Sequence, residues 1–164
     1  MSPHTIKHWL QILENLYVIF PVRPYHRNIA RSILQESKYY FYDTGAVEGD
    51  EGVRLENAVA VSLWSELNYH EDITGERTGL CTLRDKEKRE VDFLTLVNGQ
   101  PRHLIEVKWK EETFSRHLHY FKRFLPQVQA VQLVTLAERQ KSSSDGLYLY
   151  SAHTFLKDFQ LGTP

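Results

Sequence analysis

The chain lacks the features that mark several common protein classes. It has a single cysteine, Cys81, among 164 residues, so it can form neither an internal disulfide nor a cysteine-rich zinc site. That usage suits a reducing cytosol. No apolar run is long enough to span a membrane, and the N-terminus has no signal-peptide core. We therefore expect a cytoplasmic protein with no membrane partner.

The chain also lacks a strong charge of either sign and a phosphate-binding loop. Its formal net charge is -1, whereas a dedicated nucleic-acid-binding module is more often strongly basic. An enzyme acting on nucleic acid needs only a local basic face. No G-x-x-x-x-G-K-[ST] pattern occurs, so we expect no ATP bound by a phosphate loop. The composition, 41% hydrophobic and 25% charged, fits one globular domain with room for an appendage.

The stretch EVDFLTLVNGQPRHLIEVKWK, residues 90–110, reads as two strands joined by a tight turn. Asn98-Gly99 is a strong hairpin signal, because both residues tolerate positive φ. Side chains alternate along a strand, so Glu106 and Lys108 should share a face. Pairing across the turn should bring Asp92 close to both. The sequence thus predicts two carboxylates and an ammonium group at one end of an apolar hairpin.

This predicted cluster of charges has two interpretations. Carboxylates held close together repel, and charges in a half-buried sheet need compensation. Mg²⁺ compensates them well, since it binds one or two carboxylates together with waters and phosphate oxygens. The lysine could then orient or polarise a metal-bound water. The alternative is a structural ion pair between an acid and a lysine at a sheet edge.

The N-terminal half should contain two helices and an aromatic strand. Ser2-Pro3 predicts the start of a helix, and the extended residues 17–20 should end at Pro21 and Pro24. Residues 38–43 read as a strand whose aromatic side chains either pack in the core or stack on bases. A helix over residues 50–67 carries Glu56. That side chain is either a solvated acid near a helix N-terminus or a further acid aimed at the site.

The C-terminal half should continue with alternating helices and strands. An apolar stripe from Phe114 to Leu125 predicts a helix, residues 130–136 a strand buried on both faces, residues 146–151 another strand and residues 153–159 a closing helix. From residue 50 the order is α-β-β-β-α-β-β-α, which predicts an α/β fold with a mixed central sheet flanked by helices. Five basic side chains could meet a nucleic-acid backbone: Lys110, His117, His119, Lys122 and Arg123.

The acidic and lysine positions, in this order of elements, resemble the PD-(D/E)xK superfamily of restriction-endonuclease-like proteins. The matching residues are Glu56, Asp92, Glu106 and Lys108, with Val91-Asp92 in place of the superfamily's proline-aspartate pair. The resemblance implies Mg²⁺ or Mn²⁺ held by Asp92 and Glu106. Glu56 would hold a metal-bound water or a second ion, and Lys108 would position the attacking water.

Almost the whole chain is similar to a domain of unknown function, family 4143, at the C-terminus of bacterial and archaeal AAA-type ATPases. The similar segments are residues 5–20, 38–45, 55–59, 90–93 and 105–108. The resemblance implies an appendage at residues 1–45, similar to the end of a winged-helix-like linker, and a restriction-endonuclease-like domain at residues 46–164. It also implies an ATPase module as the partner in relatives. We expect no ATPase domain within these 164 residues, which are either a fragment or a stand-alone relative.

Two functions from different classes follow from the sequence. The first is a metal-dependent nuclease, a hydrolase that cleaves phosphodiester bonds of nucleic acid, with DNA the more expected substrate. The intact carboxylate and lysine positions favour it. The second is a non-catalytic interaction or regulatory module of an ATPase that keeps the nuclease fold. The near-neutral net charge favours this alternative.

Overall fold

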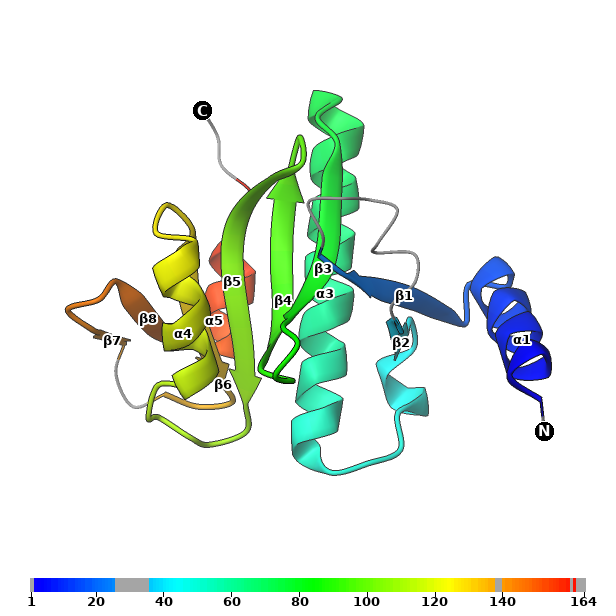
Figure 1. Ribbon diagram of the computed structural model, residues 1–164, viewed down its shortest axis with the longest axis horizontal. Helices are drawn as coiled ribbons and strands as arrows, with labels where there is room; N and C mark the ends of the chain where they lie inside the picture. Colours follow the sequence, from blue (N-terminus) through cyan, green and yellow to red (C-terminus); the bar gives the residue numbers. More distant parts are fainter. Residues whose placement is uncertain (1, 26–35, 138–139, 160, 162–164) are drawn as a thin grey trace.

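A computed structural model describes residues 2–25, 36–137, 140–159 and 161. One eight-stranded sheet crosses the molecule in the order β2-β1-β3-β4-β5-β6-β8-β7 (Figure 1). Its strands are β1 (Ile19–Pro24), β2 (Lys38–Phe41), β3 (Thr78–Arg84), β4 (Glu90–Val97), β5 (Gln100–Lys108), β6 (Gln129–Val134), β7 (Lys141–Ser142) and β8 (Leu147–Ser151). The helices are α1 (Pro3–Asn15), α3 (Glu51–Thr74), α4 (Arg116–Phe124) and α5 (Ala152–Asp158), with a short 3-10 turn, η1 (Thr44–Ala46).

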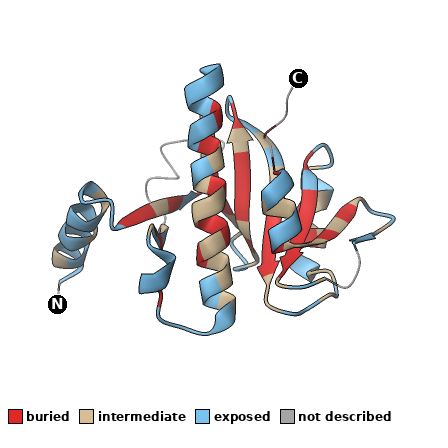
Figure 2. Cartoon of the chain, turned by 180° about the vertical axis from the view of Figure 1, so that it is seen from behind, coloured by how far each residue is buried: buried red, intermediate tan, exposed pale blue. Residues whose placement is uncertain are grey.

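Helices cover both faces of the sheet. In Figures 1 and 2, α3 and α5 lie on one face and α4 on the other. Leu63 of α3 packs in the first core with Phe93 and Ile105, and Leu118 of α4 packs in the second with Leu94 and Leu104. Burying these apolar side chains is the main favourable term in the fold. The predicted α/β class, a mixed sheet flanked by helices, is confirmed.

Local sequence signals explain the ends of the central elements. The Asp50 side chain accepts a hydrogen bond from Val53 N at 3.0 Å and so caps α3. The helix continues to Thr74, beyond the predicted end at residue 67, and stops where Gly75 adopts φ 75°. The predicted hairpin is confirmed, since Asn98 and Gly99 have φ values of 51° and 76° between β4 and β5.

Pro21 lies inside β1, so the prediction that it ends the strand is wrong, whereas Pro24 is the last residue of β1, as predicted. Tyr42 N donates to Val18 O. Because bonded residues alternate along an antiparallel pair, the even-numbered residues of β1 are the ones whose backbone groups face β2. Pro21 therefore turns its nitrogen away from β2, toward β3, whose pairing begins only at Arg23. Pro24 turns its nitrogen toward β2, whose pairing ends at Val22. Neither proline removes a ladder hydrogen bond, and the strand tolerates both.

A β-bulge changes the direction of the side chains at the start of β4. Cys81 pairs with Leu94, but Leu83 pairs with Val91, so Asp92 and Phe93 together face one residue of β3. Val91 consequently packs on the α4 side, with Leu94. Asp92 and Phe93 turn toward α3. This bulge decides where the Asp92 carboxylate lies.

The first helix stands apart from the rest of the molecule (Figure 1). Ser2 caps α1 by accepting a hydrogen bond from Thr5 N, as Ser2-Pro3 predicted, but none of the residues of α1 is buried. Strands β1 and β2 instead belong to the sheet, and Phe20, Val22 and Tyr40 lie in its first core. Among the described residues, none of the helices combines the length and apolarity that a membrane span requires.

Candidate active site

Three carboxylates surround the ammonium group of Lys38. Its Nζ lies 2.6 Å from Glu90 Oε1, 3.1 Å from Glu56 Oε1 and 3.2 Å from Asp92 Oδ1. We call these four residues the Lys38 cluster. Lys38 comes from β2, Glu56 from α3, and Glu90 and Asp92 from the start of β4. Burial lowers the pKa of Lys38, but the surrounding carboxylates outweigh burial and raise it above its usual value. Lys38 is therefore a permanent cation at neutral pH.

Two contacts fix β2 against α3 and so hold the Lys38 cluster in place. The Tyr40 hydroxyl donates to Glu56 Oε1 at 2.6 Å. Burial and the charge of Glu56 raise the pKa of Tyr40 far above its usual value, so the hydroxyl stays protonated and remains a donor. The amide of Asn57, only 4% exposed, accepts from Phe41 N and donates to Phe41 O, both at 2.9 Å. The side chains of α3 thus define the position of the strand that carries Lys38.

The Asp92 carboxylate replaces part of the hydrogen bonding between β4 and β5. Its Oδ2 accepts from the backbone N–H of Val107 at 2.9 Å, and its side chain is 15% exposed. Burial, together with the negative charges of Glu56 and Glu106, raises the pKa of Asp92 to about 7, although Lys38 opposes this change. An acid with such a pKa carries a charge that its surroundings compensate poorly.

Glu106 and Lys108 form a separate ion pair beside Asp92. Lys108 Nζ lies 2.9 Å from Glu106 Oε1, and the side chains are 36% and 4% exposed. The second oxygen, Glu106 Oε2, is buried and has no hydrogen-bond partner among the described residues. Burial lowers the pKa of Lys108, but the hydrogen bond and charge of Glu106 leave it raised. Glu106 therefore keeps an unsatisfied acceptor in the interior, which is costly without a ligand.

The predicted site residues meet at one end of the hairpin but do not share one face of the sheet. Ile105 and Val107 pack on the α3 side, so strand alternation puts Glu106 and Lys108 on the opposite side, with Leu104. The bulge turns Asp92 toward α3. The carboxylate of Asp92 lies between the two groups, bonded to Lys38 and influenced by the charge of Glu106. The sequence prediction assumed that side chains alternate regularly along β4, and the bulge breaks that alternation.

Two of the predicted metal ligands fit a hard divalent cation, and the third is engaged elsewhere. Within the described parts of the chain, no group of three or more His, Cys, Asp and Glu side chains is arranged to hold a metal ion. Glu56 Oε1 already accepts from both Tyr40 and Lys38. Asp92 and Glu106 remain, and Mg²⁺ needs only one or two carboxylates because it keeps several waters. The unpartnered oxygen of Glu106 supports this pair as the ligands.

The basic residues predicted to contact nucleic acid differ in how exposed their charges are. Lys122 Nζ donates to Pro126 O at 3.0 Å and Val128 O at 2.7 Å, so it stabilises the end of α4. His119 Nδ1 lies 3.4 Å from a carboxylate oxygen of Asp145. The ring of His117 contacts Glu90 O at 3.2 Å, beside the Lys38 cluster. The other two basic residues predicted to contact nucleic acid, Lys110 and Arg123, are exposed.

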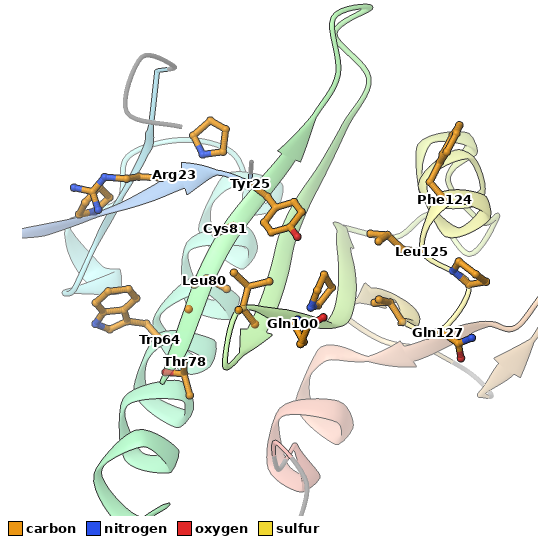
Figure 3. A pocket seen from close by; sticks show the side chains of 18 residues that line it. Arg23, Tyr25, Trp64, Thr78, Leu80, Cys81, Gln100, Phe124, Leu125 and Gln127 are labelled. Carbon is orange, nitrogen blue, oxygen red and sulfur yellow. The ribbon is translucent and has the colours of Figure 1, made fainter. Parts of the chain in front are cut away.

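A groove of about 1010 Å³ lies away from these charges. Figure 3 shows Tyr25 and Cys81 on one side of it and Phe124 and Leu125, at the end of α4, on the other. None of the carboxylates or lysines of the candidate site lines it. The groove therefore belongs to a different part of the surface from the candidate active site.

Sequence reasoning missed two members of the site, Lys38 and Glu90. Lys38 begins an aromatic strand, and nothing local links it to acids more than fifty residues later in the chain. Glu90 had a weak signal, because it lies two residues before Asp92 at the start of the same strand. The tertiary structure brings these residues together: β2 pairs with β1, β1 with β3 and β3 with β4, and α3 packs against β2.

Comparison with known proteins identifies the family of the chain. The class defined by its structure is a mixed α/β domain with a central sheet flanked by helices. A family model described as "Domain of unknown function (DUF4143)" matches residues 51–155, so the chain belongs to that family. A second model, "Domain of unknown function (DUF8612)", matches residues 1–49. Neither the curated proteins nor the solved structures gave a match.

Proposed function

We propose that the protein is a metal-dependent nuclease with a restriction-endonuclease-like core, and that it hydrolyses phosphodiester bonds. The observation that carries the proposal is the pairing of a buried, unpartnered carboxylate oxygen on Glu106 with a neighbouring Asp92 whose pKa is raised to about 7. Lys38 and Lys108 each contact one oxygen of this pair, but the second oxygen of Glu106 has no partner among the described residues. Perturbed acids of this kind concentrate at functional sites. In this proposal Asp92 and Glu106 hold Mg²⁺ or Mn²⁺, which stabilises negative charge on the phosphate.

Lys108 has the properties of a group that orients water. Its ammonium group donates to Glu106, the side chain is 36% exposed, and an ammonium group has two further N–H donors beyond that bond. The raised pKa keeps it protonated at neutral pH, so it cannot accept a proton from the water. We assign it the role of holding the attacking water by hydrogen bonding and of attracting the phosphate. Lys110 and Arg123 are exposed and could contact the backbone of nucleic acid nearby.

The direct test is cleavage of labelled single- and double-stranded DNA and RNA with Mg²⁺ or Mn²⁺, compared with EDTA. We expect metal-dependent cleavage by the wild type and none by Lys108→Ala. The matched control is Lys157→Ala, an exposed lysine of α5. It lies near Phe159, which packs on His103, toward the other end of β5. Equal activity of the wild type and Lys108→Ala would show that Lys108 has no role in cleavage.

The second candidate is a non-catalytic module that binds an AAA-type ATPase. Exposed apolar residues at α1 favour it, because Trp9 and Leu13 of the helix and its C-cap residue Leu16 are more than a third exposed, and exposed apolar patches often bind partners. This function needs no metal. It therefore predicts no change in the melting temperature with millimolar Mg²⁺ or Mn²⁺, whereas the nuclease proposal predicts an increase because the ion binds only the folded protein.

A further inference from the structure

Lys38 lies where a second divalent ion would be expected in a site with so many acids. Four carboxylates meet at this end of the sheet: Glu56, Glu90, Asp92 and Glu106. Resting on the nuclease proposal, we propose that Lys38 is a built-in cation that replaces a second metal ion. The site then takes one divalent ion, at Asp92 and Glu106, and Lys38 is a positioning residue.

The contacts of Lys38 use its full capacity for hydrogen bonding. An ammonium group has three N–H donors, and Lys38 Nζ has a carboxylate oxygen of Glu56, Glu90 and Asp92 within 3.2 Å. The three partners come from two elements, α3 and β4, so the lysine holds these elements together as a bridging ion would. A metal ion at the same place would have to displace the ammonium group from all three carboxylates.

The backbone around Lys38 opposes such a displacement. The strand that carries it pairs with β1 in a fixed register, with Lys38 opposite Val22. The two hydrogen bonds of Asn57 to Phe41 fasten the other end of β2 to α3. The bond from Tyr40 to Glu56 fastens the middle. The strand that carries Lys38 is therefore attached both to β1 and to α3.

The charges of the site balance with one divalent ion. When the four carboxylates are ionised, Lys38 and Lys108 neutralise two of them and leave two negative charges. Arg84 approaches Glu90 Oε2 only to 3.7 Å and is 45% exposed, so water screens much of its charge. One divalent ion neutralises the remainder. Two such ions beside Lys38 would give the site an excess of positive charge before any phosphate entered.

An ion can reach carboxylate oxygens of the site without displacing Lys38. Glu106 Oε2 has no partner among the described residues. Each carboxylate oxygen can accept more than one bond, so Asp92 can bind an ion while it keeps Val107 N–H and Lys38. Glu56 instead acts through Lys38. The resemblance implied that Glu56 could hold a second ion. In this proposal Lys38 takes the place of that ion.

The number of bound ions tests this inference without any measurement of cleavage. We would titrate the full chain with Mn²⁺ by isothermal calorimetry and count bound Mn²⁺ by electron paramagnetic resonance. The wild type should bind one ion per chain. Lys38→Met, which keeps the aliphatic stem and removes the charge, should bind two, because the acids around residue 38 are left without their cation. The control Lys157→Met should bind one ion, as the wild type does.

Each other result has a distinct meaning. Two ions in the wild type, or one ion with unchanged affinity in Lys38→Met, would overturn the inference and leave a metal-dependent site intact. Binding by Lys38→Met alone would also overturn it, because Lys38 would then compete for the single ion site. No binding by either protein would overturn both this inference and the proposed nuclease. If Lys38→Met does not fold, the wild-type count and Lys38→Arg, for which we expect one ion, decide the question.

Discussion

At the scale of single residues, the pair of Glu106 and Lys108 combines a buried acid with a half-exposed base. The acid is only 4% exposed, and one of its oxygens depends on Lys108. Removing the base would leave an unpaired carboxylate in the interior, where breaking a fully buried pair costs about 3–5 kcal/mol. The partial exposure of Lys108 should reduce that cost, because water screens its charge.

We therefore expect Lys108→Ala to lower the free energy of unfolding by roughly 1–3 kcal/mol in the absence of metal. Millimolar Mg²⁺ should restore part of this loss, because the ion supplies the missing positive charge. Urea unfolding with and without Mg²⁺ measures both effects. A loss that Mg²⁺ does not reduce would indicate that the pair is only a structural ion pair.

His103 should make stability depend on pH. Burial, helped by the charge of Arg102, lowers the pKa of His103 to about 4, and its ring contacts Thr95 Oγ1 at 2.9 Å. Above pH 6.5 the histidine is neutral in both states. As the pH falls from about 6.5 to about 4, the unfolded chain binds a proton that the folded chain excludes, so stability falls.

By pH 5 we expect a loss of roughly 1–2 kcal/mol from this residue. We would measure urea unfolding of the wild type and of His103→Gln at pH 7 and pH 5. The carboxylates titrate in both proteins, so the difference between the two losses of stability is the contribution of His103. The variant should lose less stability between the two pH values. Equal losses would show that His103 titrates normally.

At the scale of elements, the attachment of β2 to α3 connects the sheet edge to the site. The Asn57 side chain makes two hydrogen bonds to Phe41 and is buried. Asn57→Ala should lower the free energy of unfolding by roughly 2–3 kcal/mol, about 1 kcal/mol or more for each lost bond. The exposed Asn68, whose side chain donates to Trp64 O of the same helix, is the matched control, and Asn68→Ala should cost less than about 0.5 kcal/mol.

Hydrogen exchange gives an independent measurement of the same attachment. Amide protons of β2 should exchange faster in Asn57→Ala, whereas those of the hairpin between β4 and β5 should keep their protection. Unchanged exchange in β2 would mean that pairing with β1 alone holds this strand.

Those elements also show how far local sequence signals reach. Asn98-Gly99, the Ser2 cap and the apolar run of β6 follow from the chemistry of neighbouring residues, and the sequence predicted all three. The bulge at Asp92 could not be predicted, because it results from a mismatch in pairing with β3. The prediction for Pro21 of β1 failed for a related reason, since the effect of a proline depends on which neighbouring strand its nitrogen faces. The meeting of Lys38 with Glu90 depends on the whole sheet.

At the scale of the molecule, the boundary between the two family models falls within one sheet and one core. The models meet near residue 50, yet Phe20, Val22 and Tyr40 lie in the same core as Phe93. We expect a fragment of residues 51–164 to lose cooperative unfolding, since it would lack two strands and expose that core. A fragment of residues 18–164 should keep cooperative unfolding, because no residue of α1 is buried.

Circular dichroism melting of both fragments and of the full chain tests this expectation. A sharp transition for residues 51–164 would show that the second family region folds independently. It would also mean that the site can form without Lys38.

The central claim is that Asp92 and Glu106 bind the catalytic ion while Lys38 keeps its place. The most direct test is the anomalous diffraction signal of Mn²⁺ in crystals of the full chain. We predict one peak at about 2.1 Å, the distance typical of a small hard cation, from an oxygen of Asp92 and from Glu106 Oε2, with Lys38 still bonded to Glu56 and Glu90. A peak among Glu56, Glu90 and Asp92 with Lys38 displaced, or no peak near Glu106 in saturating Mn²⁺, would contradict the account.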